Sequence, residues 1–344
     1  MRAAVYYNNR DVRIEEVPRP VIGPRELLVK ILASGICGTD LLEWYRLRKA
    51  PLVLGHEIAG TVAEMGEEVQ GFSEGDRVFV SHHVPCNACR YCLAGNHTVC
   101  DTLHTTNFDP GGFAEYVRVP AVNVETGTFE LPESMSFDEG TFIEPLGCVI
   151  RGQRAAGGCV GRTILVLGSG ISGLLHLMLA RSAGAERVIA TDVVPAKLER
   201  AQELGADDVI DARADVPALL KDRNHGRGAD LVIVCTGAES AFAQAMDAVD
   251  RAGTVLCFAT TQPGVDLSIP INAFWRNSIT VMSSYAAAPS DLEEAIRAIS
   301  AGVTDVCRLV THRLPLERAG EGFQLMADGN EAVKVLLYPH GVPA

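Results

Sequence analysis

The chain has 344 residues, 47 % of them apolar, and a formal net charge of −13. A chain of this length exceeds what one hydrophobic core usually supports, so the sequence predicts two domains. The acidic balance argues against a nucleic-acid-binding protein, which needs clustered Lys and Arg to neutralise phosphates. The sequence has no apolar run of membrane-spanning length and no signal-peptide pattern in its first residues. We therefore expect a cytoplasmic protein without a membrane partner.

The first residues alternate like a β-strand. The next distinctive stretch, LGHEIAG at residues 54–60, sets two metal-ligand types, His56 and Glu57, side by side. A zinc protease motif of this type needs a second His four residues after the first, but that position is Gly60. Any metal bound here must take further ligands from other parts of the chain.

Four of the ten cysteines lie in one short segment, PCNACRYCLAGNHTVC at residues 85–100. Four thiolates suit a closed tetrahedral zinc site, which staples a segment that has little core of its own. An iron–sulfur site uses the same ligands, and a metal-free loop is a third alternative. We favour structural zinc, and interpret His82, His83 and His97 as solvated side chains. The predicted ligands are Cys86, Cys89, Cys92 and Cys100.

A strand, a glycine-rich turn and a helix are predicted from TILVLGSGISGLLHLMLARS, which begins at Thr163. In such a turn the first glycine permits the tight bend, the second lets the backbone approach a pyrophosphate, and the third allows close helix–strand packing. The helix N-terminus then faces the phosphates with its positive end. The candidate coenzyme contacts are Gly168, Gly170, Ile171, Ser172 and Gly173.

A second predicted strand, 187–191, ends at Asp192. A carboxylate at this distance from the turn accepts hydrogen bonds from the adenosine ribose and repels a 2′-phosphate, which favours NAD over NADP. The alternative is a solvated Asp that closes the strand. Three further strand signals follow, LGADDVID, ADLVIVCTG with the candidate coenzyme residue Thr236, and GTVLCFATT. Residues 152–288 are therefore predicted to form a doubly wound parallel sheet.

Six motifs occur in a fixed order: GICGTD (35–40), GHE (55–57), the four-cysteine segment, GGFAEY (111–116), EPLGCV (144–149) and the glycine turn. Together they resemble, over the whole chain, the zinc-dependent medium-chain alcohol dehydrogenases, and within them the sorbitol and threonine dehydrogenase branch. The resemblance implies a Rossmann-type doubly wound α/β domain at 152–288. It also implies a discontinuous β-rich GroES-like catalytic domain, formed by residues 1–151 and a C-terminal return, 289–344.

The resemblance also supplies partners for LGHEIAG. It implies that Cys37 and His56 bind a catalytic zinc, and that Glu57 is a third ligand or exchanges with water. Glu144 stands where the alcohol dehydrogenase branch has a second Cys, which favours a polyol-type enzyme. Thr39 matches the family hydroxyl that hydrogen-bonds the bound alcohol. Without the resemblance, Cys37 is interpreted as a small buried residue and Glu144 as a carboxylate at a helix start.

Two lysines match positions near the coenzyme, Lys334 at the pyrophosphate and Lys197 beside the adenosine ribose, although each alone is an ordinary surface lysine. One position departs from the pattern: many relatives carry a His five residues after the first zinc Cys, and here it is Leu42. The segment after Leu42 is short, and we interpret its charged residues as solvated, with contact to a charged substrate as the alternative. These are Glu43, Arg46 and Arg48.

The resemblance implies reversible, zinc- and NAD-dependent oxidation of a secondary alcohol, such as a polyol, sugar alcohol or related diol, to a ketone. A threonine-type amino-acid or hydroxy-acid dehydrogenase is the main alternative, and a catalytically silent coenzyme-binding protein is a second one. The family pairs its coenzyme domains through edge strands, for which 278–286 is the candidate here. The expected partners are a small-molecule substrate and further copies of the chain, in a homodimer or homotetramer.

Overall fold

The computed structural model describes residues 1–343. The chain divides into two compact units. The discontinuous unit comprises Met1–Gly147 and the segment from Ala286 onward, and the parallel-sheet unit comprises Cys148–Tyr285. No helix within the described residues is both long enough and apolar enough to cross a membrane.

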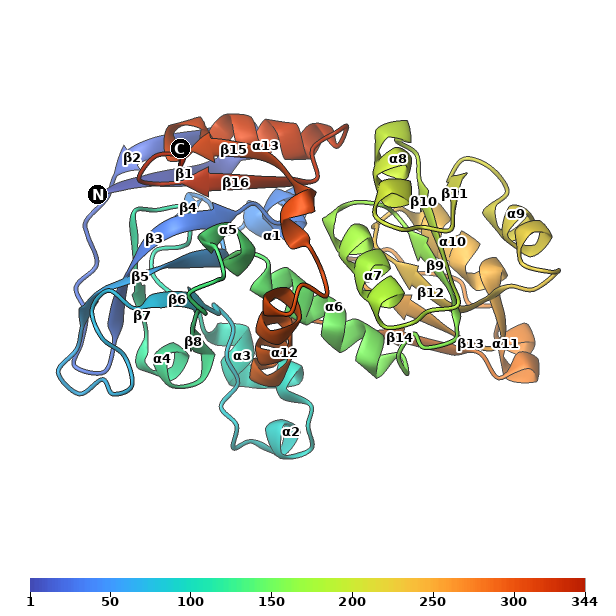
Figure 1. Ribbon diagram of the computed structural model, residues 1–344, viewed down its shortest axis with the longest axis horizontal. Coiled ribbons are helices and arrows are strands. Elements are labelled where there is room, and N and C mark those ends of the chain that lie inside the picture. Colours follow the sequence, from blue (N-terminus) through green and yellow to red (C-terminus); the bar gives the residue numbers. More distant parts are fainter. Residues whose placement is uncertain (344) are drawn as a thin grey trace. The chain divides into compact units, whose positions relative to one another are not determined.

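Two sheets build the discontinuous unit, which has the β-rich character that the sequence predicted. Its large sheet has seven strands, in the order β15-β16-β3-β5-β6-β8, with β7 paired to β3. In Figure 1 the C-terminal strand β16 (red) lies in this sheet beside β3 (blue), which is why the chain must return to its first unit. The strands are β3 (Leu27–Gly35), β5 (Glu57–Met65), β6 (Arg77–Val80), β7 (Tyr116–Val119), β8 (Thr128–Glu130), β15 (Val310–Pro315) and β16 (Lys334–Tyr338). The small sheet contains β1 (Arg2–Asn8), β2 (Asp11–Glu16) and β4 (Leu52–Val53).

Register brings the end of β3 beside the start of β5 and near the start of β16. Gly35 pairs with Glu57 on one side and with Leu336 on the other, antiparallel in both cases. The chain leaves β3 into a short 3₁₀ turn, η1 (Gly38–Leu41). Residues just after β3, just before β5 and at the first position of β16 therefore meet at one end of the sheet.

The parallel-sheet unit is a six-stranded sheet in the order β11-β10-β9-β12-β13-β14, with every pair parallel. It confirms the predicted Rossmann-type doubly wound fold. The order reverses beside β9, whose five residues are all buried, and ligands of such sheets bind at the carboxyl ends of the strands at this reversal. The strands are β9 (Thr163–Leu167), β10 (Arg187–Asp192), β11 (Asp208–Asp211), β12 (Ala229–Val234), β13 (Val249–Cys257) and β14 (Thr280–Ser283).

Helices connect the parallel strands, and two of them, α9 and α10, supply Leu220 and Phe242 to a core that β9 and β12 share. The unit's helices are α7 (Ile171–Ser182), α8 (Pro195–Glu203), α9 (Val216–Arg223), α10 (Glu239–Ala248) and α11 (Ile271–Asn277). The remaining helices are α1 (Glu43–Arg46), α2 (Arg90–Leu93), α3 (Asp101–Thr105), α4 (Ala121–Gly127), α5 (Phe137–Gly140), α6 (Ile143–Ala155), α12 (Pro289–Ser300) and α13 (Ala319–Asp328).

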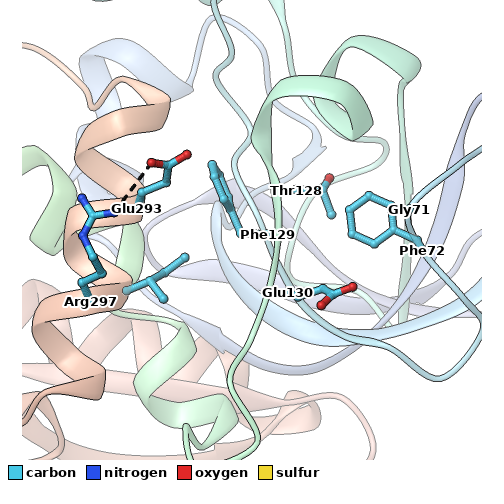
Figure 2. A pocket seen from close by; sticks show the side chains of 8 residues that line it. Gly71, Phe72, Thr128, Phe129, Glu130, Glu293 and Arg297 are labelled. Carbon is cyan, nitrogen blue, oxygen red and sulfur yellow. Dashed lines mark ion pairs between the residues drawn. The ribbon is translucent and has the colours of Figure 1, made fainter.

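The discontinuous unit has a hollow of about 420 Å³ between α12, β8 and the loop at Gly71. Figure 2 shows the ion pair of Glu293 and Arg297, at 3.8 Å, on one side of this hollow and Phe72 on the other. None of the predicted site residues lines it. The predicted site residues next to β3, β5 and β16 lie instead at the end of the large sheet where these strands meet.

Candidate metal and coenzyme sites

Cys37, His56 and Glu57 come together at the end of the large sheet, with one ligand atom of each within 4.8 Å of the others. Cys37 caps η1, and its Sγ accepts hydrogen bonds from the backbone N–H of Thr39, at 3.4 Å, and from the Thr39 hydroxyl, at 3.3 Å. These two contacts fix the position of the sulfur, which is the atom of Cys37 that can bind a metal. Thr39 thus lies beside the metal-ligand group, and its hydrogen bond to a substrate alcohol, which the family resemblance implies, stays a prediction.

His56 is oriented by a buried carboxylate. Its Nδ1 lies 3.5 Å from Oδ1 of Asp40, which is completely buried. Burial lowers the pKa of His56, but the charges of Asp40 and Cys37 outweigh it and raise the pKa well above its ordinary value. With Nδ1 committed to Asp40, Nε2 is the nitrogen left to bind a metal. Asp40 lies within the GICGTD motif, and the motif alone did not indicate this contact with His56.

Glu57 has a buried carboxylate with one oxygen suited to binding a cation. Its side chain is 1 % exposed, and its Oε2 pairs with the ammonium of Lys334, which is fully buried. Its Oε1 is buried and accepts no hydrogen bond from the described residues. A buried carboxylate oxygen without a partner is costly unless a cation binds it. The donor set of thiolate, imidazole and carboxylate therefore fits a zinc ion.

Gly35 leaves the space in which the Lys334 and Glu57 side chains meet. A Cβ at Gly35 would overlap both the Glu57 carboxylate and the Lys334 ammonium. The alternative of an ordinary surface lysine at 334 is wrong, since the side chain is fully buried at the start of β16. Its predicted proximity to the coenzyme pyrophosphate stays a prediction.

Glu144 lies in the first turn of α6 and is partly exposed. It is outside the group whose ligand atoms all lie within 4.8 Å of one another. Its role as a further metal ligand stays a prediction.

The structure corrects the interpretation of His82 as a solvated side chain. Its ring centroid lies 4.7 Å from that of His56, and its Nδ1 is buried without a hydrogen-bond partner in the described residues. The ring of His83 packs against that of His82, with the centroids 3.8 Å apart and the planes tilted by 32°. Antiparallel pairing of β5 with β6, with Ile58 opposite Val80, brings these residues together. No local sequence pattern reports that pairing.

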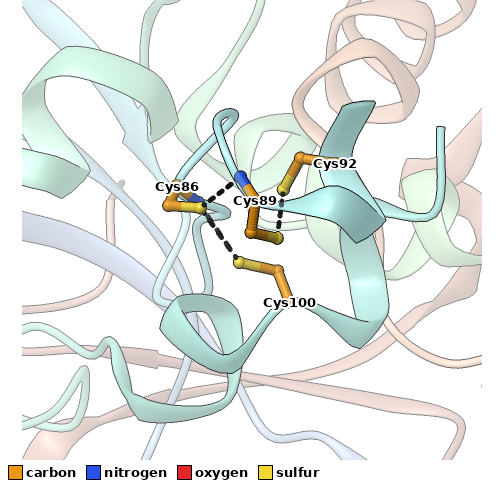
Figure 3. A group of neighbouring side chains, drawn as sticks. All are labelled: Cys86, Cys89, Cys92 and Cys100. Carbon is orange, nitrogen blue, oxygen red and sulfur yellow. Dashed lines mark hydrogen bonds between the residues drawn. The ribbon is translucent and has the colours of Figure 1, made fainter. Parts of the chain in front are cut away.

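The four cysteines of the 85–100 segment form a second group, with their sulfur atoms within 4.8 Å of one another (Figure 3). Sγ–Sγ distances are 3.5 Å for Cys89 and Cys92 and 3.6 Å for Cys86 and Cys100, so the thiols are close but not bonded as disulfides. Burial raises the pKa of Cys100, but backbone N–H donors such as that of Cys86 lower it more, to about 6. Four cysteines held this close together, beside helices of only three to five residues, fit a closed structural metal site.

The glycine turn lies at the carboxyl end of β9. Gly168 has φ +96°, and a Cβ at Gly173 would overlap the carbonyl oxygen of Gly168, so both positions need glycine. Gly170 caps α7 and has open space around its Cα. Ile171 and Ser172 form the first turn of α7, where backbone N–H groups are available to an anion.

Asp192 and Thr236 flank this turn. The Asp192 carboxylate accepts hydrogen bonds from the N–H groups of Ser169, at 2.8 Å, and Val194, at 2.9 Å. Thr236 lies against Gly168. The ends of β9, β10 and β12 thus gather the predicted coenzyme residues of these strands. Lys197 is half-buried on α8, and its predicted coenzyme contact stays a prediction.

Comparison with known proteins identifies two family regions. Residues 23–131 match the alcohol dehydrogenase GroES-like domain, and residues 172–301 match the zinc-binding dehydrogenase domain. Sorbitol dehydrogenase of Bacillus subtilis (strain 168) is 31 % identical over 99 % of this chain and 98 % of its own length. L-threonine 3-dehydrogenase of Symbiobacterium thermophilum is 32 % identical over 95 % of this chain and 94 % of its own.

Solved structures are similar to this chain over almost its whole length. Alcohol dehydrogenase TADH from Thermus sp. ATN1 matches with a TM-score of 0.88 at 29 % identity, covering 98 % of this chain and 99 % of that one. A chain from Sinorhizobium meliloti 1021, solved bound to NADP, matches with a TM-score of 0.86 at 31 % identity and the same coverage.

Proposed function

The chain belongs to the zinc-binding medium-chain dehydrogenases of the polyol and threonine dehydrogenase kind, and within them we propose that it oxidises a polyol, sugar alcohol or related diol at a secondary hydroxyl with NAD. The observation that carries this proposal is the group of Cys37, His56 and Glu57, with its unpartnered Oε1. The reaction is reversible hydride transfer between the carbinol carbon and the nicotinamide. A neutral alcohol is consistent with the similarity to sorbitol dehydrogenases.

Cys37 and His56 would hold the catalytic zinc, with Glu57 and Glu144 as further candidate ligands. When bound, such an ion supplies a Lewis acid that lowers the pKa of a coordinated hydroxyl toward neutrality. The Thr39 hydroxyl, 3.3 Å from Cys37 Sγ, is placed to take a hydrogen bond from the substrate hydroxyl and to pass its proton outward. Thr39 is exposed and residue 42 is leucine, so we propose that water receives this proton.

The glycine turn supports the coenzyme part of the proposal. The open space at Gly170 lets a pyrophosphate reach the backbone at the positive end of α7. The Asp192 carboxylate lies at the end of β10, where it would accept hydrogen bonds from ribose hydroxyls and repel a 2′-phosphate. We therefore propose NAD for this chain, although a similar chain was solved with NADP.

A threonine-type dehydrogenase is the second candidate, and the 32 % identity to L-threonine 3-dehydrogenase favours it. The two candidates differ in whether the substrate needs an ammonium or carboxylate group. We further propose residues 1–151 and 289–344 as the catalytic domain, residues 152–288 as the coenzyme domain, a structural zinc in the cysteine group, a cytoplasmic location, and a dimer or tetramer. Pairing through β14 is expected because β14 is an edge strand.

NADH formation by the zinc-loaded protein tests the function, over sugar alcohols, vicinal diols, simple secondary alcohols and threonine, with NADP as the alternative coenzyme. Cys37→Ser removes a predicted ligand, and Cys307→Ser, another free cysteine of the same unit, is the matched control. We expect turnover of a polyol or diol with NAD that is lost only in Cys37→Ser. Activity that survives in Cys37→Ser would refute the catalytic site. Silence of the whole panel in a protein that still binds NADH would favour a silent coenzyme-binding protein.

A further inference from the structure

Arg46 lies against the turn that carries Cys37, although its segment reads as solvated. The helix α1 folds back, so that Arg46 reaches Thr39, seven residues earlier. Its Nε donates to the carbonyl oxygen of Thr39 at 3.0 Å, and its Nη2 donates to the Thr39 hydroxyl at 3.4 Å. The side chain is only 15 % exposed, and its guanidinium lies 4.8 Å from the ring centroid of Tyr45. The interpretation of Arg46 as solvated is therefore wrong.

The same guanidinium also binds the carboxylate that orients His56. Nη2 of Arg46 lies 3.3 Å from Oδ1 of Asp40, and this oxygen is also the one that faces His56 Nδ1. The other oxygen, Oδ2, accepts the backbone N–H of Cys37 at 3.2 Å. Asp40 therefore touches both Cys37 and His56, and Arg46 holds Asp40 from the opposite side.

Charge makes this contact necessary. A fully buried carboxylate is costly unless a cation or several hydrogen bonds compensate it. An imidazole that binds a metal is neutral and supplies Asp40 with a hydrogen bond but no charge. In the described residues, Arg46 is the permanent cation in an ion pair with Asp40. Its planar fork reaches three acceptors on two consecutive residues, whereas a lysine ammonium on one flexible stem would not span the same set.

We propose that Arg46 is a positioning residue of the zinc site, which acts through Asp40 and Thr39 to fix Cys37 and His56 for metal binding. The inference rests on the metal site proposed above, but it adds a residue from outside the ligand group. A partner behind a ligand of this kind changes metal affinity or activity by about 10- to 100-fold when it is removed.

The test compares Arg46→Gln, which removes the charge, with Arg46→Lys, which keeps it. Arg48→Gln, an exposed arginine two residues along, is the matched control. The readouts are the affinity of the catalytic site for zinc in competition with a chelator, the visible spectrum of the cobalt-substituted protein, and the thermal midpoint of the metal-free protein. We expect a zinc affinity lower by about 10- to 100-fold in Arg46→Gln, an altered cobalt spectrum, and partial rescue by lysine. Arg48→Gln should match the parent chain.

If Arg46 only stabilises the fold, its replacement should affect the thermal midpoint and not the binding of metal. If Arg46→Gln lowers the midpoint of the metal-free protein while zinc affinity and the cobalt spectrum match the parent chain, the proposal fails. Asp40→Asn provides a second route should Arg46→Gln not fold. If Arg46 acts through Asp40, adding Arg46→Lys to Asp40→Asn should lower the zinc affinity only a little further. Losses of zinc affinity that add fully in this double variant would contradict the proposal. If the proposed metal site itself is wrong, Cys37→Ser will retain the metal content of the parent chain. This outcome is distinct from failure of the Arg46 proposal.

Discussion

Lys334 and Glu57 form a fully buried ion pair between residues 277 positions apart in the chain. Lys334 opens the last strand and Glu57 opens β5, and both strands are brought together by β3 between them. The pair leaves one Glu57 oxygen without a partner. The structure thus neutralises the carboxylate from one side and leaves its other side available to the proposed metal.

Replacing Lys334 with methionine should destabilise the protein by about 3–5 kcal/mol, because it leaves the Glu57 carboxylate charged and buried without its cation. Urea denaturation of the metal-free protein measures this. Adding Glu57→Gln to Lys334→Met should recover much of the loss. Lys221→Met, at an exposed site on α9, controls for loss of a lysine. A loss below about 1 kcal/mol in Lys334→Met, the range of exposed pairs, would contradict the account.

Cys86→Ser should remove one equivalent of bound metal per chain and leave the other in place, because the two ligand groups share no residue. The segment between Cys86 and Cys100 should then exchange its amide hydrogens faster, since short helices of this kind depend on the metal for their order. Metal analysis and hydrogen exchange report these effects. Cys159→Ser, a buried cysteine of the other unit, should change neither. Unchanged metal content in Cys86→Ser would contradict a metal-binding role for this group.

Sequence patterns predicted the sites whose residues lie close together in the chain. The glycine turn is specified by residues within one strand–turn–helix unit, and the four thiolates lie on a single segment. Both therefore appear in the structure as expected from spacing alone. The family resemblance added Cys37 as a partner for His56, and the proximity of these two residues depends on the pairing of β3 with β5.

The contacts that were missed are those that strand register creates over long distances. The approach of His82 to His56 needs the β5–β6 pairing, and the burial of Lys334 needs β16 to return beside β3. Arg46 was misjudged for a different reason. Its segment is mostly exposed and carries further charges at Arg48 and Lys49, and only the turn of α1 brings its guanidinium to Asp40. The composition of a segment does not indicate where any one of its side chains points.

Two alanine substitutions in the glycine turn should separate coenzyme binding from folding. Gly170 has φ −72° and open space around it, so Gly170→Ala should fold like the parent chain and bind NADH at least about tenfold more weakly, because the methyl group occupies the approach of the pyrophosphate. Gly173→Ala should instead lower the thermal midpoint of the free protein, since its Cβ would overlap the Gly168 carbonyl. Thermal melts and NADH fluorescence titration measure both effects. Parent-like NADH affinity in Gly170→Ala would show that the phosphates bind elsewhere.

His176 should make the protein less stable in mild acid. Its ring is fully buried on α7, where Gln153 Nε2 lies 3.2 Å from Nδ1, and burial lowers the pKa of His176 to about 3. In the unfolded chain the imidazole of residue 176 has an ordinary pKa near 6.5 and becomes protonated in mild acid, whereas in the folded chain it stays neutral. Stability is therefore complete above about pH 6.5 and falls by about 1.4 kcal/mol for each pH unit below it, until the folded pKa is reached.

Between pH 7 and pH 5, the parent chain should lose about 2 kcal/mol more unfolding free energy than His176→Leu. Leucine keeps the apolar contact with Phe258 and leaves the 2.7 Å hydrogen bond from Gln153 to the backbone carbonyl of residue 176 available. Urea denaturation at the two pH values measures the difference. His225→Gln, at an exposed histidine of the same unit, should follow the parent chain. Equal losses in the parent chain and His176→Leu would mean that the buried ring reaches a proton without unfolding.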